Sequence, residues 1–228
     1  MPTGIPPKNE VPVAHHQLLP SGSFLWRIDR SGRETDSPFR PPAESHEVDS
    51  DRWSERFDPT PECPYPYCYA AFDDLTALCE VLLRDVRFDA RLRYLPMQAV
   101  AGRSLVLLET LRPLWLVSLL DAADLAAVRQ DSWLVHIDWA DYPITRLWAH
   151  WLRESTSPVG DEPPAGIVWP SKRQPSGRVV LLFGDRCGDA VVRSSFGERR
   201  LDRPEGQQWL RRRLSLLRTG FARAGADV

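Results

Sequence analysis

Three polar or charged residues stand at places in the sequence where their side chains could bind a ligand or take part in catalysis. Arg27 stands in the middle of the apolar segment 24–28; because an unpaired charge is costly to bury, it either faces solvent or meets an anion. Ser171 follows the apolar segment 166–170, where a hydroxyl can contact a ligand, although a serine in a turn more often bonds backbone groups. Glu80 lies roughly 140° around its expected helix from the apolar residue Leu75, and taken alone it is typical of a solvated charge.

The elements that must position such residues are clearest in the middle of the first half of the chain. Ser54–Pro66 contains Arg56 and four prolines, which is too much proline for a helix interior and predicts a turn-rich loop. Tyr67–Ala71 is a short apolar run of strand-like residues that includes Tyr69. The sequence therefore predicts a loop followed by a strand.

A helix is predicted directly after this strand. Asp73 and Asp74 supply its start, because carboxylates cap the first turn and are favoured by the helix dipole. One buried stripe follows at helical spacing, formed by Leu75, Leu78, Cys79, Leu82 and Val86. Glu80 belongs to this helix but not to its stripe.

The other expected elements are distributed irregularly along the chain. Strands are predicted at 24–28, 104–110, 166–169 and 179–183, helices at 121–129, 142–154 and 206–224, and the segment 113–120 fits either. In the helix 142–154 we expect the apolar residues to face the core while Arg146 and Arg153 point away. This interleaving favours an α+β domain over a doubly wound sheet.

The overall composition is that of an ordinary globular protein. Charged residues make up 26% and hydrophobic residues 43% of the chain, and a net charge of -2 gives no global attraction to nucleic acid or acidic membranes. No apolar run is long enough to span a membrane, and the N-terminus lacks a secretory signal pattern, so we expect a cytoplasmic protein. We expect residues 1–20 to form a flexible, proline-rich arm and 21–228 to form a single domain ending in a helix.

The cysteines give no sign of a metal site. Cys63, Cys68, Cys79 and Cys187 have neither CxxC spacing nor paired histidines at ligand spacing. We therefore expect reduced thiols and no metal.

The order of the candidate residues resembles the RES domain, a family named for an arginine, a glutamate and a serine and known as NAD-degrading toxins. The pattern is an early strand arginine, an Arg-Phe followed by prolines, a strand tyrosine, a helix glutamate, and a Gly-Ile-x-aromatic-x-Ser segment before a Val-Leu-Phe strand. The residues that match it are Arg27, Arg56, Tyr69, Glu80 and Ser171. The match covers 24–185, and its specific part is the order of short motifs; Glu55 departs from the family, which has a glycine there.

This resemblance implies an ADP-ribosyltransferase-like fold, a mixed-sheet core with flanking helices, in which NAD is bound and the bond between nicotinamide and ribose is broken. It implies that Arg27 and Arg56 bind the pyrophosphate, for which a guanidinium offers planar, permanently charged donors. Tyr69 would stack on the flat nicotinamide cation. Glu80 would stabilise the positive charge that develops on the ribose, and Ser171 would orient the ribose or a phosphate. Arg27, Glu80 and Ser171 are thus the predicted catalytic residues, and no metal is implied.

The resemblance also implies a biological role and leaves alternatives. Family members are commonly the toxin of a toxin–antitoxin pair and are neutralised by an Xre-type helix-turn-helix antitoxin, with no direct contact to nucleic acid. The acceptor of the ADP-ribose group is water or phosphate in the first hypothesis and a protein side chain in the second, which makes the protein an ADP-ribosyltransferase. A third hypothesis is a non-catalytic interaction module whose proline-rich arms bind a partner. The sequence does not decide the acceptor or whether the chain forms a homo-oligomer.

Overall fold

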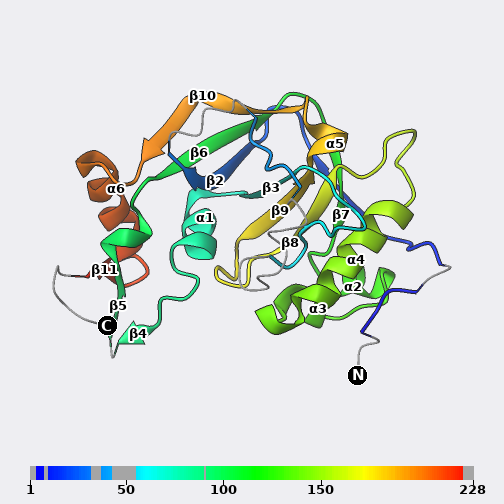
Figure 1. Ribbon diagram of the computed structural model, residues 1–228, viewed down its shortest axis with the longest axis horizontal. Helices are drawn as coiled ribbons and strands as arrows, with labels where there is room; N and C mark the ends of the chain where they lie inside the picture. The colour runs from blue at the N-terminus through cyan, green and yellow to red at the C-terminus, as the bar shows by residue number, and fades with distance from the viewer. Residues whose placement is uncertain (1–3, 8–9, 32–36, 43–54, 90, 223–228) are drawn as a thin grey trace.

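The main feature of the computed structural model is a curled sheet of eight strands in the order β1-β7-β8-β9-β3-β2-β6-β10 (Figure 1). The structure describes residues 4–7, 10–31, 37–42, 55–89 and 91–222. Strands β7 and β8 pair in parallel and all other neighbours in this sheet pair antiparallel, so the sheet is mixed. Its strands are β1 (His16–Leu19), β2 (Phe24–Arg30), β3 (Tyr67–Ala71), β6 (Arg103–Thr110), β7 (Leu114–Ser118), β8 (Gly166–Pro170), β9 (Arg178–Phe183) and β10 (Val191–Arg200).

Helices and a second sheet flank this one. A small sheet of three strands, in the order β11-β5-β4, lies beside helix α6 at one end of the molecule (Figure 1). Its members and that helix are β4 (Phe88–Asp89), β5 (Leu92–Leu95), β11 (Thr219–Phe221) and α6 (Pro204–Ser215). The remaining helices and 3-10 turns are α1 (Asp74–Val81), η2 (Met97–Ala99), α2 (Ala122–Ala127), α3 (Trp133–His136), η3 (Trp139–Asp141), α4 (Tyr142–Ser155) and α5 (Gly184–Cys187).

The two faces of the large sheet carry separate apolar clusters, because side chains alternate along each strand. We call the face that packs against α1 the inner face; its cluster includes Leu78 of α1 and Leu181 of β9. The outer face holds the second cluster, which includes Leu25, Cys68 and Val180. Helix α1 therefore lies under the curl of the sheet, where Figure 1 shows it between the strands and the small sheet.

Several expectations from the sequence are confirmed. The chain is an α+β domain with a mixed sheet and flanking helices, and β3 covers Tyr67–Ala71 as expected. Helix α1 begins after Asp73, whose side chain accepts a hydrogen bond from the backbone N–H of Thr76 at 2.8 Å. The ambiguous segment 113–120 contains the strand β7.

In the described part of the chain, no helix has the length and apolar character needed to cross a membrane.

The ends of the chain differ from expectation. The last residues of the expected arm, His16–Leu19, form β1 and pair with β7 at the edge of the sheet, so the sheet begins before residue 21. The C-terminal helix α6 ends at Ser215, and β11 follows it and pairs in parallel with β5. The turn between them is made possible by Arg218, whose φ of 50° lies in the left-handed region.

The orientation of α4 also corrects the sequence analysis. Arg146 and Arg153 are buried rather than turned to solvent, whereas Leu147 is exposed. Arg146 donates from Nε to the carbonyl oxygen of Glu55, and the guanidinium of Arg153 lies over the ring of Tyr65 at 4.8 Å from its centroid. Periodicity missed these arginines because their long side chains reach polar partners beneath the helix.

Candidate active site

The site is centred on a hydrogen bond between two residues 91 positions apart: the hydroxyl of Ser171 donates to Oε1 of Glu80 at 2.5 Å. Glu80 lies in the last turn of α1, off the buried stripe, and is partly exposed. Ser171 directly follows β8 and is buried. Oε2 of Glu80 has no hydrogen-bond partner among the described residues, so the carboxylate is fixed by one oxygen and can accept a donor with the other.

The turn after β8 holds the serine in place. The Ser171 hydroxyl oxygen accepts hydrogen bonds from the backbone N–H groups of Arg173 and Gln174 at 3.1 and 2.9 Å. The turn closes where the N–H of Ser171 donates to the carbonyl of Gly177 at 2.9 Å. A Cβ at Gly177 would overlap the side chain of Thr76 in α1, so only glycine allows this turn to approach the helix so closely. The close approach sets Ser171 against Glu80.

Arg56 brings a buried positive charge to the same site. Arg56 is only 8% exposed. Its guanidinium lies over the ring of Tyr142, 5.6 Å from the ring centroid, and donates from Nη2 to the carbonyl oxygen of Ile137 at 3.4 Å. Burial lowers the pKa of Arg56, while neighbouring groups that include Glu80 act in the opposite direction. Its Nε is enclosed and has no hydrogen-bond partner among the described residues. Because the enclosed Nε is out of reach of a ligand, the terminal Nη groups are the part of this guanidinium that can bind an anion.

Tyr69 supports the loop that carries Arg56. Its hydroxyl oxygen accepts a hydrogen bond from the N–H of Phe57 at 3.1 Å, and its ring packs edge-on against Trp169 at 6.1 Å between centroids. Burial and the nearby carboxylate of Asp58 raise the pKa of Tyr69 well above its ordinary value of 10.0. The phenol therefore stays protonated, and Tyr69 lies close enough to Arg56 to act on the pKa of that guanidinium.

Arg27 is not brought together with these four residues. It lies on an interior strand and shares the outer face with Cys68, because its Nη1 is 3.1 Å from the Cys68 sulfur. The same nitrogen donates to the carbonyl of Pro38, and Nη2 lies 3.8 Å from the carboxylate of Asp29. The sheet separates Arg27 from Glu80, so the expectation that Arg27 contacts the same ligand has no support in this geometry.

The structure adds residues that the sequence analysis did not select. Lys172, next to Ser171, donates from Nζ to the carbonyl of Ile137 at 3.4 Å, the same oxygen that Arg56 contacts. Lys172 also pairs with Asp138 at 2.5 Å, which ties the segment between α3 and η3 to the turn after β8. His136 lies close by, and its pKa is lowered by partial desolvation and then by the charges of Arg56 and Lys172. Only the adjacency of Lys172 to Ser171 could have signalled this group from the sequence.

The arrangement joins an anionic and a cationic group in one place. The carboxylate of Glu80 can stabilise a positive charge, and the guanidinium of Arg56 can bind an anion a short distance away. A ligand that carries both a cationic ring and phosphate groups fits this pair chemically. Among the described residues no group of three His, Cys, Asp or Glu side chains is placed to hold a metal ion, and the four cysteines are free thiols.

Comparisons with known proteins agree with the pattern in the sequence. The family model described as the RES domain matches residues 24–205, which is most of the chain. Among solved structures, the crystal structure of the M. tuberculosis MbcT–MbcA toxin–antitoxin complex contains a chain that is similar at a TM-score of 0.46 and 15% sequence identity. The similarity covers 78% of this chain and 84% of that one. No curated protein matches the sequence.

Proposed function

Since the chain belongs to the RES domain family, we propose that it degrades NAD⁺ by breaking the bond between nicotinamide and ribose. The observation that supports this most is the carboxylate of Glu80, held by Ser171 at 2.5 Å beside the buried guanidinium of Arg56. The α+β architecture with its mixed sheet is consistent with an ADP-ribosyltransferase-like fold.

The proposed reaction uses the charge that NAD⁺ itself supplies. The bond between C1′ of the ribose and the ring nitrogen breaks, and its electron pair leaves with nicotinamide, which becomes neutral. Positive charge then develops on the ribose, as in other glycosyl transfers. A fixed carboxylate is worth most at this point, because it is already oriented and need not reorganise when the charge appears. The acceptor oxygen bonds to C1′ and gives up a proton.

Each residue of the site has a role in this proposal. Glu80 stabilises the charged ribose, or holds its hydroxyls, through the unoccupied Oε2. Ser171 fixes Oε1 and so orients the carboxylate. Arg56 binds a phosphate oxygen through the terminal Nη groups of its guanidinium. The Tyr69 ring contacts the nicotinamide, and its hydroxyl keeps the backbone at Phe57 in place.

Arg27 has a different role in the proposal. Its contacts with the carbonyl of Pro38 and with Cys68 join β2 to the segment before Arg40 and to β3 on the outer face. Asp29, which also pairs with Arg193 at 2.8 Å, balances its charge. We therefore assign Arg27 to the support of the sheet and not to substrate contact.

Incubating the purified chain with NAD⁺ and identifying the products tests the activity. Release of nicotinamide with free ADP-ribose indicates hydrolysis, ADP-ribose 1″-phosphate formed in phosphate buffer indicates phosphorolysis, and labelled protein indicates ADP-ribosyl transfer. A non-catalytic module would leave NAD⁺ intact at every enzyme concentration. The Glu80→Gln variant should lose the activity, and intact NAD⁺ with the unaltered chain would overturn the proposal.

We also infer that the protein acts as the toxin of a toxin–antitoxin pair in the bacterial cytoplasm. The basis is the family, and the proposed partner is an Xre-type antitoxin. Expressing the chain in bacteria should deplete NAD and stop growth, while a Glu80→Gln variant produced at the same level should do neither. Growth arrest by both proteins with unchanged NAD levels would contradict this role.

A further inference from the structure

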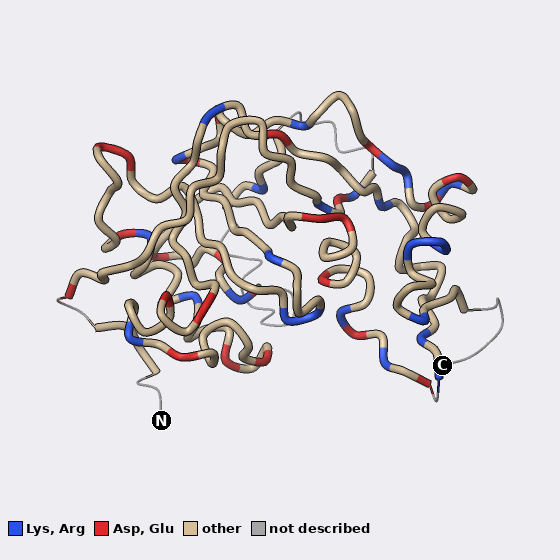
Figure 2. The backbone as a smooth tube through the Cα atoms, turned by 180° about the vertical axis from the view of Figure 1, so that it is seen from behind, with Lys and Arg blue, Asp and Glu red and all other residues tan. Residues whose placement is uncertain are grey.

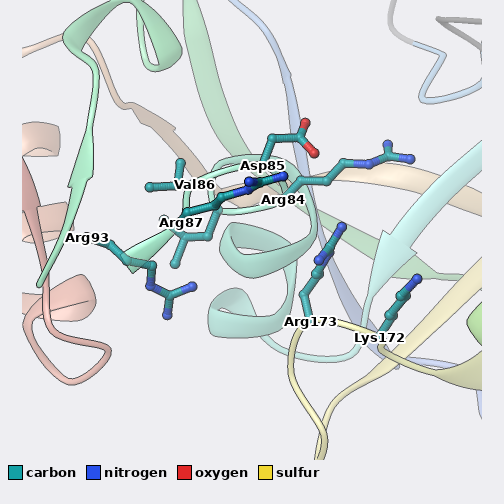
Figure 3. Close-up of a pocket in the computed structure, with 8 residues that line it drawn as sticks. Arg84, Asp85, Val86, Arg87, Arg93, Lys172 and Arg173 are labelled. Atoms are coloured by element: carbon teal, nitrogen blue, oxygen red, sulfur yellow. The ribbon is translucent and has the colours of Figure 1, made fainter. Parts of the chain in front are cut away.

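A basic pocket of about 410 Å³ opens directly beside the candidate active site (Figure 3). Its lining combines the segment after α1, one residue of β5 and the turn after β8. The charged residues that line it are Arg84, Asp85, Arg87, Arg93, Lys172 and Arg173. Five of these six are cationic, in a chain whose net charge is -2, so positive charge is concentrated here.

Part of this charge is not neutralised by the protein. Arg84 pairs with Glu55, and Lys172 pairs with Asp138. By contrast, the guanidinium groups of Arg87 and Arg173 have no carboxylate partner within the described ranges. Gathering like charges raises the energy of the folded protein, and a bound anion would offset that cost.

Arg93 contributes a guanidinium to the pocket lining that an aromatic ring holds in place. Its Nε is enclosed, and within the described part of the chain it has no hydrogen-bond partner. Its guanidinium lies over the ring of Phe88, 4.6 Å from the centroid, while Nη2 reaches the carbonyl of Leu217 only at 3.5 Å. The stacked ring orients the guanidinium, and because Nε is enclosed, an anion in the pocket would be bound by the terminal Nη groups of Arg93.

The pocket is continuous with the site. Arg84 lies four residues after Glu80, just beyond the end of α1, and Lys172 and Arg173 are the two residues after Ser171. The backbone N–H of Arg173 also points to Oε1 of Glu80 at 3.4 Å. Figure 2 shows blue Lys and Arg positions on both the segment after α1 and the turn after β8, and Figure 3 shows these two segments facing each other across the pocket. A molecule with its ribose at Glu80 can therefore extend its next groups into the pocket.

We propose that the basic pocket binds the phosphate of the adenosine half of the dinucleotide and so makes the enzyme selective for dinucleotides over nicotinamide mononucleotide. This rests on the proposed function. Arg56 would contact the phosphate next to the nicotinamide ribose, and Arg87 and Arg173 the one beyond it. Guanidinium groups suit this task because they remain charged and can donate to two phosphate oxygens at once.

The same chemistry could bind inorganic phosphate as the acceptor instead, so the experiment separates the two sources. The test is a double variant, Arg87→Ser with Arg173→Ser, whose side chains can be shortened without leaving a buried carboxylate unpaired. Its control is Arg30→Ser with Arg212→Ser, which removes the same charge from exposed positions outside the pocket. Cleavage of NAD⁺ and of nicotinamide mononucleotide is measured in phosphate-free buffer and again with phosphate added.

We expect kcat/KM for NAD⁺ to fall at least about tenfold in the pocket variant, mainly through KM, because each lost charged hydrogen bond accounts for about that factor. Its preference for NAD⁺ over the mononucleotide should fall by the same factor, and the control should match the unaltered protein. The proposal fails if the two substrates lose equally, if neither changes, or if the defect appears only with added phosphate.

A binding measurement separates failure of the pocket from failure of the proposed function. Isothermal titration calorimetry with ADP-ribose needs no turnover, and the pocket variant should bind it at least about tenfold more weakly than the control. If the unaltered chain binds ADP-ribose in this way but never cleaves NAD⁺, the activity is wrong and the pocket assignment stands. If NAD⁺ is cleaved and the variant binds ADP-ribose like the control, only the pocket assignment is overturned.

Discussion

The hydroxyl of Ser171 is fully engaged in the structure, because it donates to Glu80 at 2.5 Å and accepts from two backbone N–H groups of its own turn. Glu80 is thereby anchored through one oxygen while the other stays unpaired among the described residues. The pair behaves as a preformed carboxylate site, in which the serine sets geometry and the glutamate supplies charge.

Replacing Glu80 by Gln should abolish the charge and keep the shape. We expect kcat for nicotinamide release to fall about 10²- to 10³-fold, as for other preorganised electrostatic contacts. The melting temperature should stay within a few degrees of the unaltered protein, because Glu80 is partly exposed. Glu198→Gln on the exposed part of β10 is the matched control and should leave activity unchanged. Normal turnover by Glu80→Gln would remove the carboxylate from the mechanism.

Ser171→Ala should affect both activity and stability. Two turn N–H groups lose their acceptor, at a cost of about 1–3 kcal/mol in the free energy of unfolding. We propose that Ser171 acts on the reaction only through Glu80. The double variant Ser171→Ala with Glu80→Gln should therefore turn over no more slowly than Glu80→Gln alone. A double-mutant cycle on kcat measures this, and fully additive losses would show that Ser171 acts independently of the carboxylate.

Gly177→Ala should push the turn after β8 away from α1, because the added Cβ overlaps Thr76. We expect a loss of activity with KM and kcat both affected, since Ser171 would no longer meet Glu80. Adding Thr76→Ala removes the two nearest of the three atoms that the new Cβ meets, which leaves only Cγ of Gln174, and should restore part of the activity. Thr76→Ala alone serves as the reference, and an active Gly177→Ala enzyme would argue against the need for close approach.

Arg27→Ala should mainly destabilise the fold. Removing one partner of a buried ion pair typically costs about 3–5 kcal/mol, here moderated by the second contact of Asp29 with Arg193. Urea unfolding measures the loss, and NAD⁺ cleavage per folded molecule should be retained. The opposite result, a stable protein with a large loss of turnover, would show that the sequence-based prediction of a catalytic Arg27 is right.

Acid should destabilise the protein through His136. Its pKa lies below the ordinary value of 6.5 because of partial desolvation and the charges of Arg56 and Lys172, so the unfolded chain binds more protons near this pH. Stability should therefore fall as pH decreases through about 6.5, the ordinary pKa of histidine, toward the lower pKa of the folded protein. In His136→Gln this part of the loss should be absent. Equal pH dependence in both proteins, measured by urea unfolding, would contradict the assignment.

Much of the local structure and the composition of the site follows from the sequence. Asp73 caps α1 because a carboxylate can accept the free N–H groups of a first turn, and Tyr67–Ala71 forms a strand from its own residue types. Because Glu80 lies off the apolar stripe of α1, its side chain had to face away from the hydrophobic core on which that stripe packs. These features depend on neighbours within a few residues, and the order of motifs along the chain then pointed to the RES family.

Only the tertiary structure decided which of these residues meet. Side chains alternate along β2, which places Arg27 and Trp26 on opposite faces of the sheet. Which of these two faces packs against α1 depends on the pairing of β2 with β3 and β6, and those strands are distant in the sequence. Likewise, Glu80 meets Ser171 because Gly177 lets a turn from the second half of the chain approach α1. Such contacts arise from packing between distant segments, and local propensity carries no information about them.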